Sequence, residues 1–413
     1  MNSSLLRKCN QVVILKSQIQ NAAIRSLSSV PAERKADFAP RIISHGSFPD
    51  VTTQKLRRGT GGRSSYNGLT VTVFGSTGFL ARSVVNNLGQ IGSQIICPYR
   101  GDPYFLKELK LAGDLGQVLF VPFNLRDVDS LYTAMKHSNV VINLIGRDNS
   151  TPNFDLESIH VEGARTISRI AREAGVKRLI HVSSLNSSPN PEEFYVKGGS
   201  NFLKTKYYGE QAVREEFPDA TIFRPADMYG VLDKYLWYYC SGYRRNFRRL
   251  PLHNGGYGIT KTPVCVSDVA QGIVNAISDE ESIGKTFDAV GPRRYELRMM
   301  MEYLQEIIMK TPENGGFKIN NLRWDAIMRA RISITTYMSK NVLRAPKVSW
   351  EKIERECYSD ESTDNPTLSD LGVRLSFIED KWPDQLITWR YDFSYDGDLG
   401  EKKLFTNPPF IVE

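Results

Sequence analysis

The sequence predicts an α/β protein: a doubly wound parallel sheet with helices on both faces, followed by a smaller, mostly helical C-terminal lobe. Two observations predict the sheet. Short apolar segments alternate with longer helical patterns from about residue 68 to residue 290, and such alternation is typical of parallel strands joined by crossover helices. Each apolar segment is also bounded by turn or charged residues, as buried parallel strands are. Past Arg294 the alternation fails, which predicts a change of architecture.

Six segments are predicted as strands because they are short and rich in Val, Ile and Phe: 69–75, 93–99, 117–123, 139–146, 178–184 and 220–226. Between them, helical patterns cover 79–90, 127–138, 154–175 and 201–217. The third of these helices should end at Ala174-Gly175, because glycine readily adopts the left-handed conformation that closes a helix. Two amphipathic helices are expected in the C-terminal lobe, over 295–310 and 324–343.

The amino terminus has the composition of a mitochondrial presequence. The first acidic residue is Glu33, whereas the preceding segment contains Arg7, Lys8, Lys16 and Arg25 among Ser, Leu, Ile and Ala. A disordered basic tail is the alternative; a secretory signal fits worse, because Lys16 interrupts the apolar run. We expect a presequence over 1–35 and a Gly/Arg/Ser-rich arm over 36–67. The tail that ends the chain is too irregular to assign, and we expect a partner to order it.

Charge and cysteine content exclude several classes of function. The formal net charge is +7, and removal of the four cations before Glu33 would leave +3, so net charge gives no support to nucleic-acid binding. The five cysteines lie far apart without a C-x-x-C motif, which indicates neither a zinc site nor a disulfide framework. No metal site is expected. No run of 18 apolar residues is present, so no membrane span is predicted.

A glycine motif follows the first predicted strand. Gly75-x-x-Gly78-x-x-Ala81 lies between a strand and a helix, where the chain must turn sharply and bring backbone N–H groups against a pyrophosphate at the positive end of the helix. Ala81 can perform the close helix packing for which a third glycine is otherwise used. This context predicts a Rossmann-type NAD(P)-binding domain over 68–290, and leaves 291–413 as a helical lobe with a subunit-contact tail.

The end of the second predicted strand favours NADPH over NADH. An NAD enzyme presents an acid to the ribose hydroxyls there, but this chain has Arg100, whose guanidinium suits a 2′-phosphate. Asp102 keeps an NAD site open as an alternative, and Arg82 is a second candidate phosphate contact. Asn124 or Leu125 would lie near the adenine, while Asp127 is expected to cap a helix. Gly146 would let the backbone pass close to the cofactor.

The order and spacing of "LIHVSSLNSS", "NFLKTKYYGEQ", "FRPADMYG" and "VCVSDVAQGI" resemble those of extended or atypical short-chain dehydrogenase/reductases. The strings "TVFGSTGFLARSVVNNLGQIGSQIICPYRGD", "GDLGQVLF" and "SNVVINLIGRDNSTPNF" resemble more specifically the 39 kDa, reductase-like accessory subunits of mitochondrial NADH:ubiquinone oxidoreductase, complex I. The resemblance covers residues 61–291 strongly and the remainder more loosely. It implies a matrix-side subunit of the peripheral arm that holds NADPH without established turnover, with other complex I subunits as partners.

The resemblance also assigns the catalytic positions. Ser184 lies in the position of the catalytic Ser/Thr, Phe202 in that of the tyrosine, and Lys206 in that of the lysine. A tyrosine there exchanges the substrate proton, and phenylalanine cannot, whereas Lys206 can still hold the nicotinamide ribose. These positions are therefore expected to be vestigial. The expected nucleotide-binding residues are Gly75, Ser76, Thr77, Gly78, Phe79, Leu80, Arg82, Arg100, Asn124, Leu125, Gly146, Ser183 and Lys206.

Two alternatives stay open. An active NADPH-dependent reductase or epimerase would need Ser184 and a displaced tyrosine, with Tyr195 as a weak substitute, to replace the missing group at Phe202. The segment "YLWYYCSGYRRNFRRLP" interleaves aromatic residues with basic ones between Arg244 and Arg249. That patch could meet anionic lipid or an acidic subunit face, or it could be a solvated helix end.

Overall fold

The computed structural model describes residues 59, 61–151, 153–245, 247–308, 316–341, 348–361, 363–390 and 407–411. The predicted presequence, most of the predicted arm and most of the C-terminal tail lie outside the described residues. Residues 49–413 belong to one compact unit. No helix in the described part of the chain has both the length and the hydrophobicity that crossing a membrane requires.

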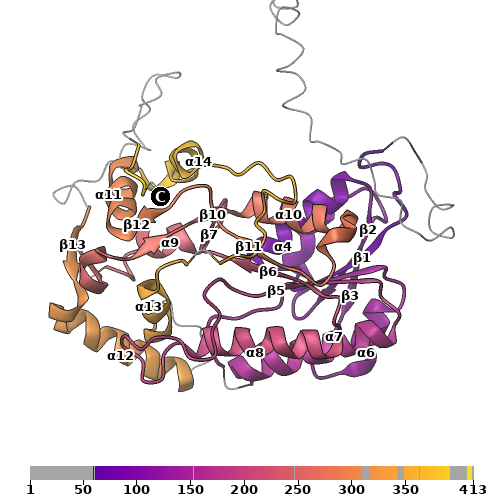
Figure 1. Ribbon diagram of the computed structural model, residues 1–413, viewed down its shortest axis with the longest axis horizontal. Coiled ribbons are helices and arrows are strands. Elements are labelled where there is room, and N and C mark those ends of the chain that lie inside the picture. Colours follow the sequence, from indigo (N-terminus) through magenta and orange to yellow (C-terminus); the bar gives the residue numbers. More distant parts are fainter. Residues whose placement is uncertain are drawn as a thin grey trace, which may run out of the picture. The chain divides into compact units, whose positions relative to one another are not determined.

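A seven-stranded parallel sheet forms the centre of the described chain, in the order β11-β6-β5-β4-β1-β2-β3 (Figure 1). This confirms the predicted doubly wound fold. The winding reverses between β1 and β4, where Phe74 pairs with Asn143, and ligands of such sheets bind at the carboxyl ends of the strands at this reversal. The strands are β1 (Thr70–Phe74), β2 (Gln94–Tyr99), β3 (Val118–Pro122), β4 (Val140–Asn143), β5 (Arg178–Val182), β6 (Thr221–Pro225) and β11 (Thr286–Ala289).

Helices cover both faces of this sheet. On one face lie α4 (Phe79–Gln90) and α10 (Val266–Ser278), and on the other α6 (Val128–Met135), α7 (Gly163–Glu173) and α8 (Asn201–Glu216) (Figure 1). The apolar sides of these helices are buried against strands of Val, Ile and Phe. This burial explains why apolar strand segments alternate with amphipathic helical segments in the sequence.

The predicted helix ends are confirmed in two cases. The side chain of Asp127 accepts a hydrogen bond from the Asp129 N–H (3.3 Å) at the start of α6. Helix α7 ends at Glu173 with Ala174 as its C-cap, and Gly175 follows with φ of +72°. The predicted helix over 154–175 is broken into a π-helical turn at Ser158–Glu162 and then α7.

A second core lies beside the sheet and draws on two separated stretches of the chain. Residues 229–265 and 295–389 both contribute buried side chains to it. Its helices are α9 (Tyr235–Cys240), α11 (Leu297–Ile307) and α14 (Ile378–Gln385), and its short strands are β7 (Met228–Tyr229), β8 (Arg249–Leu252), β10 (Val264–Cys265), β12 (Tyr295–Glu296) and β13 (Lys318–Asn321). Strand β9 (Thr260–Lys261) pairs with β12. The helices α12 (Ala326–Asn341) and α13 (Trp350–Cys357) bury their apolar side chains in a separate cluster, and α5 (Lys107–Lys110) lies apart, after β2. The predicted helices over 295–310 and 324–343 correspond to α11 and α12, whereas α13 and α14 were not predicted.

The position of Arg244 shows that the predicted basic surface patch was wrong for this residue. Its side chain is fully buried in this second lobe and forms an ion pair with Glu356 of α13 (Nη2–Oε1, 2.9 Å). The Arg244 guanidinium was expected at the surface beside neighbouring aromatic residues. It is instead buried because the Glu356 carboxylate, more than 100 residues later in the chain, pairs with it. Arg244 therefore cannot take part in a surface contact.

Trp382 of α14 is the largest fully buried side chain of the described residues and packs against Tyr229 and Tyr303. We expect Trp382→Ala to lower the free energy of unfolding by about 3–5 kcal/mol, because it removes a large apolar side chain and leaves a cavity. Trp324→Ala is the matched control, since Trp324 is 83% exposed, and it should change stability by no more than about 0.5 kcal/mol. Urea unfolding followed by circular dichroism measures both; equal losses would contradict the assigned core.

Candidate functional site

The turn after β1 is shaped as a cradle for a phosphate group. Gly75 has φ of +78°, and a Cβ there would lie 2.9 Å from the Leu144 carbonyl oxygen at the end of β4. Gly78 is the N-cap of α4, and its N–H donates to the Gly75 carbonyl (2.9 Å). No side chain caps α4, and its first turn has no acidic residue. The leading N–H groups of a twelve-residue helix therefore remain available to an anion.

The other residues of this turn have distinct environments. The buried Ser76 hydroxyl donates to the Pro98 carbonyl (3.1 Å), so its side chain ties the turn to β2. Thr77 is exposed, Phe79 is partly buried, and Leu80 points into the core. Arg82 forms an ion pair with Glu108 (2.9 Å), so its guanidinium already has a partner at the surface.

Two arginines lie on one aromatic ring near the end of β2. The guanidinium carbon of Arg100 is 5.2 Å from the centre of the Phe154 ring, and that of Arg126 is 4.5 Å from it. Arg126 also donates to the Asn153 carbonyl (2.6 Å). Asp102, the alternative ribose contact, accepts the Tyr104 N–H (2.8 Å) and so caps a helical turn. The sequence alone did not single out Arg126 or Phe154, although Arg126 directly follows the two expected adenine contacts.

Those two residues lie at the end of β3. The Asn124 side chain accepts the Arg126 N–H (3.2 Å), which orders the turn that leads into α6. Leu125 packs toward the core formed by α6 and α7 and lies close to Gly163. The structure thus places both residues on the edge where the strand ends, beside the loop that carries Phe154.

Lys206 lies at the centre of the site and is buried. Its Nζ donates to the Val182 carbonyl at the end of β5 (3.0 Å) and would lie 3.3 Å from a Cβ at Gly146. Burial lowers the pKa of Lys206 to about 8, although Glu210 and Asp148 act in the opposite direction. An ammonium with three donors and one protein acceptor is suited to take further oxygen ligands.

Ser183 and His181 each carry a buried polar atom that has no partner. Within the described residues, the Ser183 Oγ and the His181 Nε2 make no hydrogen bond, although both side chains are almost fully buried. Such atoms are costly unless a ligand satisfies them. Burial also lowers the pKa of His181 to about 3, so its ring is neutral. The glycine cradle, the uncapped helix, Lys206 and the Ser183 hydroxyl together fit a dinucleotide that runs from α4 to the end of β5.

The Phe202 ring, which the sequence resemblance assigns to the position of the catalytic tyrosine, lies between two other side chains. His160 packs edge-on against it (5.3 Å between centroids), and the Arg355 guanidinium of α13 lies 4.2 Å from its centre. His160 accepts the Arg147 N–H at Nε2, and its Nδ1 bonds Thr205. Burial, followed by the charge of Lys206, lowers the pKa of His160 to about 2, so the ring is neutral at neutral pH and is a weak proton acceptor.

Helix α13 is fastened over this position by its carboxylates. Glu351 accepts the Phe202 N–H (2.9 Å) and bonds the Ser200 hydroxyl at the start of α8. Glu354 is fully buried and accepts three successive backbone N–H groups, those of residues 194–196, at 2.7–3.1 Å. Arg355 completes the contact through Asp148 (3.3 Å). Although burial acts to raise the pKa of Asp148, Arg355 and Lys352 outweigh it and lower that pKa.

The remaining hydroxyls are engaged elsewhere. The Ser184 Oγ donates to the adjacent Leu185 carbonyl (3.2 Å), as a hydroxyl at a strand end often does. Tyr195 bonds His253 through its hydroxyl (2.9 Å) and stacks on Trp350, and burial raises its pKa to about 12. Tyr208 is half-exposed, and its ring contacts that of Tyr207. No described contact brings a tyrosine hydroxyl to Lys206.

We expect Gly75→Ala to abolish retention of a nicotinamide nucleotide, because the methyl group would strain a left-handed turn and press on the Leu144 carbonyl. Gly116→Ala is the matched control: its φ is +80° but a Cβ there meets nothing within 4 Å. Both changes should cost about 1–2 kcal/mol of backbone strain. Only the first should lower the nucleotide released when the purified protein is denatured; equal nucleotide content would remove the cradle from the site.

Comparisons with known proteins agree with this geometry. Residues 75–236 match the NAD(P)H-binding family model. The chain is 42% identical over 358 residues to the mouse protein named NADH dehydrogenase [ubiquinone] 1 alpha subcomplex subunit 9, mitochondrial, covering 86% of this chain and 90% of the relative. It is 35% identical to the Neurospora crassa NADH-ubiquinone oxidoreductase 40 kDa subunit, covering 91% and 94%.

Among solved structures, the triphenylmethane reductase of Citrobacter sp. has a TM-score of 0.56 at 14% identity, covering 77% of this chain and 99% of that one, which shows a shared fold. The glycine cradle thus belongs to an NAD(P)H-binding domain, and the similarity to the mouse and Neurospora proteins extends over most of the chain. This protein is therefore a member of the family of NADH:ubiquinone oxidoreductase 1 alpha subcomplex subunit 9, the reductase-like subunits of mitochondrial complex I.

Proposed function

We propose that this protein is a non-catalytic accessory subunit of mitochondrial respiratory complex I that binds NADPH as a structural cofactor. In this role it lies peripherally on the matrix side of the inner membrane and supports the assembly and stability of the peripheral arm near its junction with the membrane arm. Its partners are the other subunits of the complex. Membership of the family supports the location, and the geometry around Phe202 supports the absence of chemistry.

One observation carries the non-catalytic assignment: the position of the proton donor is apolar and is covered by the protein's own helix. Phe202 is 8% exposed and lies under Arg355, while Glu351 and Glu354 hold α13 in place. Hydrogen bonds to charged groups stabilise by about 1.5–3 kcal/mol each, so displacement of α13 by a substrate would be costly. The alternative, an active NADPH-dependent reductase or epimerase, lacks both a donor and a free approach at this point.

NADPH can stabilise the fold without reacting. We assign the pyrophosphate to the turn at Gly75 and Gly78, the nicotinamide ribose to Lys206, and the carboxamide side to Ser183. Bound NADPH would supply a hydride, but a reductase also needs a proton donor for the carbonyl oxygen, which Phe202 is not. A ligand present at about a hundred times its dissociation constant adds about 2.7 kcal/mol of stability to the folded state.

The preference for NADPH is assigned to Arg100, with Arg126 as a second guanidinium beside it. We expect Arg100→Ala to weaken NADPH binding about tenfold or more and to leave NADH binding nearly unchanged, because only NADPH has the 2′-phosphate. Arg82→Ala is the control, since that side chain already pairs with Glu108. Calorimetric titration of the nucleotide-free protein measures both affinities. If the wild type binds NADH as tightly as NADPH, the assignment is wrong.

The proposed absence of catalysis is tested by introducing a tyrosine, as proton donor, at position 202. The wild type and Phe202→Tyr alone should show no NADPH oxidation above background with aldehydes, ketones, quinones or nucleotide sugars, because α13 covers the position in both. Phe202→Tyr combined with Arg355→Ala supplies donor and access, and should reduce carbonyls faster than Phe202→Leu with Arg355→Ala. Absorbance of NADPH follows each reaction.

Robust turnover by the wild type that survives in Phe202→Ala and disappears in Ser184→Ala would contradict the non-catalytic role. It would show that Ser184 and another donor carry out the reaction, as the reductase alternative requires.

A further inference from the structure

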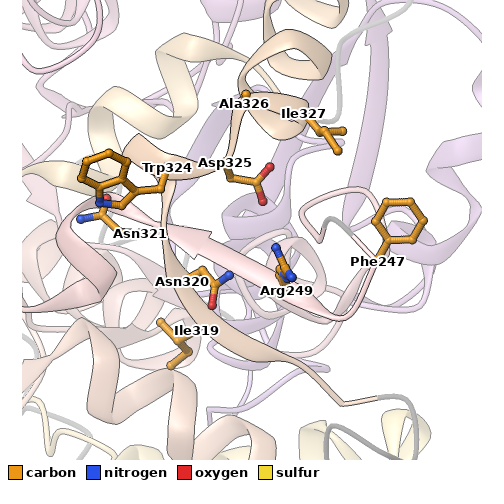
Figure 2. Close-up of a pocket in the computed structure, with 9 residues that line it drawn as sticks. All are labelled: Phe247, Arg249, Ile319, Asn320, Asn321, Trp324, Asp325, Ala326 and Ile327. Carbon is orange, nitrogen blue, oxygen red and sulfur yellow. The ribbon is translucent and has the colours of Figure 1, made fainter.

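An open pocket of about 850 Å³ lies in the second lobe, remote in sequence from the glycine turn and lined by β8, β13 and the start of α12 (Figure 2). Three large apolar side chains at the edge of this pocket are exposed to solvent. Phe247 is 88% exposed, Trp324 83% and Ile327 63%. A cluster of such exposed aromatic and aliphatic side chains is unfavourable in water. It indicates a surface that a membrane or another molecule covers.

The apolar edge continues along α12. Ile334 and Met338 are also more than half exposed, and their spacing of seven and eleven residues from Ile327 places all three on one face of the helix. Met328 and Ile332 occupy a different face and are fully buried, so they fix α12 to the lobe. The exposed stripe is thus held rigidly outward and is not the side by which α12 packs.

Positive charge surrounds this stripe. In the described segments 247–252 and 316–338 the only acidic residue is Asp325, and its carboxylate accepts the Met328 N–H (2.9 Å) at the start of α12. The same segments contain six basic residues: Arg248, Arg249, Lys318, Arg323, Arg329 and Arg331. The guanidinium of Arg249, which lies in the pocket (Figure 2), forms no ion pair or hydrogen bond with the described part of the chain. The surface therefore complements a strongly anionic partner.

We propose that this surface, the pocket with the outward stripe of α12, docks on an anionic phospholipid bilayer. Arg249 contacts a lipid phosphate, and Phe247, Trp324 and Ile327 enter the boundary between head groups and acyl chains. Protruding aromatic and aliphatic side chains set among arginines are the pattern of helices that lie in the plane of a membrane interface. The inference deepens the proposed peripheral membrane location and rests on it. The surface keeps Arg248 and Arg249 of the basic patch expected over Arg244–Arg249 and excludes Arg244, which is buried.

The experiment measures co-sedimentation of the full chain, with its nucleotide bound, with vesicles. Vesicles of phosphatidylcholine alone are compared with vesicles that also contain phosphatidylglycerol. The wild type should bind the second kind only, and more weakly as salt is added. Arg249→Glu should weaken binding on the order of tenfold, since it reverses one charge at the surface. Phe247→Ser with Trp324→Ser should reduce binding at high salt, where the apolar contribution remains.

Matched control variants distinguish binding by this surface from nonspecific binding to vesicles. Leu115→Ser removes a fully exposed apolar side chain elsewhere, and Lys136→Glu reverses an exposed charge elsewhere; both should bind vesicles as the wild type does. Nucleotide content is measured on every sample. Its retention in variants that lose vesicle binding would support a separate lipid surface. Nucleotide loss in the wild type would count against the NADPH assignment alone.

Two outcomes would overturn the lipid surface. One is equal binding of the wild type to both kinds of vesicle, or equal weakening by the controls. The other is absence of vesicle binding while the same Arg249 and Trp324 variants release the chain from isolated complex I, which would assign the surface to an acidic face of another subunit.

Discussion

The proposed non-catalytic role depends on the contact between α13 and the start of α8. Glu354 satisfies three backbone N–H groups ahead of α8, and Glu351 satisfies one at Phe202 itself. Glu354 is fully buried and Glu351 is partly buried, so removal of α13 would leave the N–H groups that they accept without these partners. Arg355 then rests on the Phe202 ring because its own helix is fixed. In the proposed role, this helix fills the place where a substrate carbonyl would otherwise meet a proton donor.

The same arrangement leaves the nucleotide side of the site intact. Three groups can offer hydrogen-bond donors to an anion: the turn at Gly75, the uncapped start of α4 and the ammonium of Lys206. Binding an anion in this way requires no proton transfer. Burial lowers the pKa values of His160 and His181, so both imidazoles are weak proton acceptors. A site of this composition can hold a nucleotide firmly and gain stability from it, which suits a subunit within a larger assembly.

The sequence predicted the sheet well because each of its first six strands is a short apolar run that can be recognised locally. It did not predict β11, whose four residues have no distinctive pattern and are a strand only because β6 pairs with them. Helix α13 was not predicted for a related reason: "WEKIEREC" is polar, and the burial of Glu354 depends on N–H groups from a loop that is far away in sequence. Arg244 was misplaced for the same cause, since Glu356 is its partner. Phe154 and Arg126 meet Arg100 through folding alone.

The central claim, that the nucleotide is held and not turned over, is tested most directly inside the working complex. Complex I isolated from mitochondria with this subunit in place would be allowed to oxidise NADH with a quinone for many turnovers, and the nucleotide bound to the subunit would then be extracted and its redox state measured. The account predicts NADPH in the same amount per chain as before turnover, still reduced. Conversion of that nucleotide to NADP⁺, or its exchange with added labelled NADPH on the timescale of NADH oxidation, would contradict it.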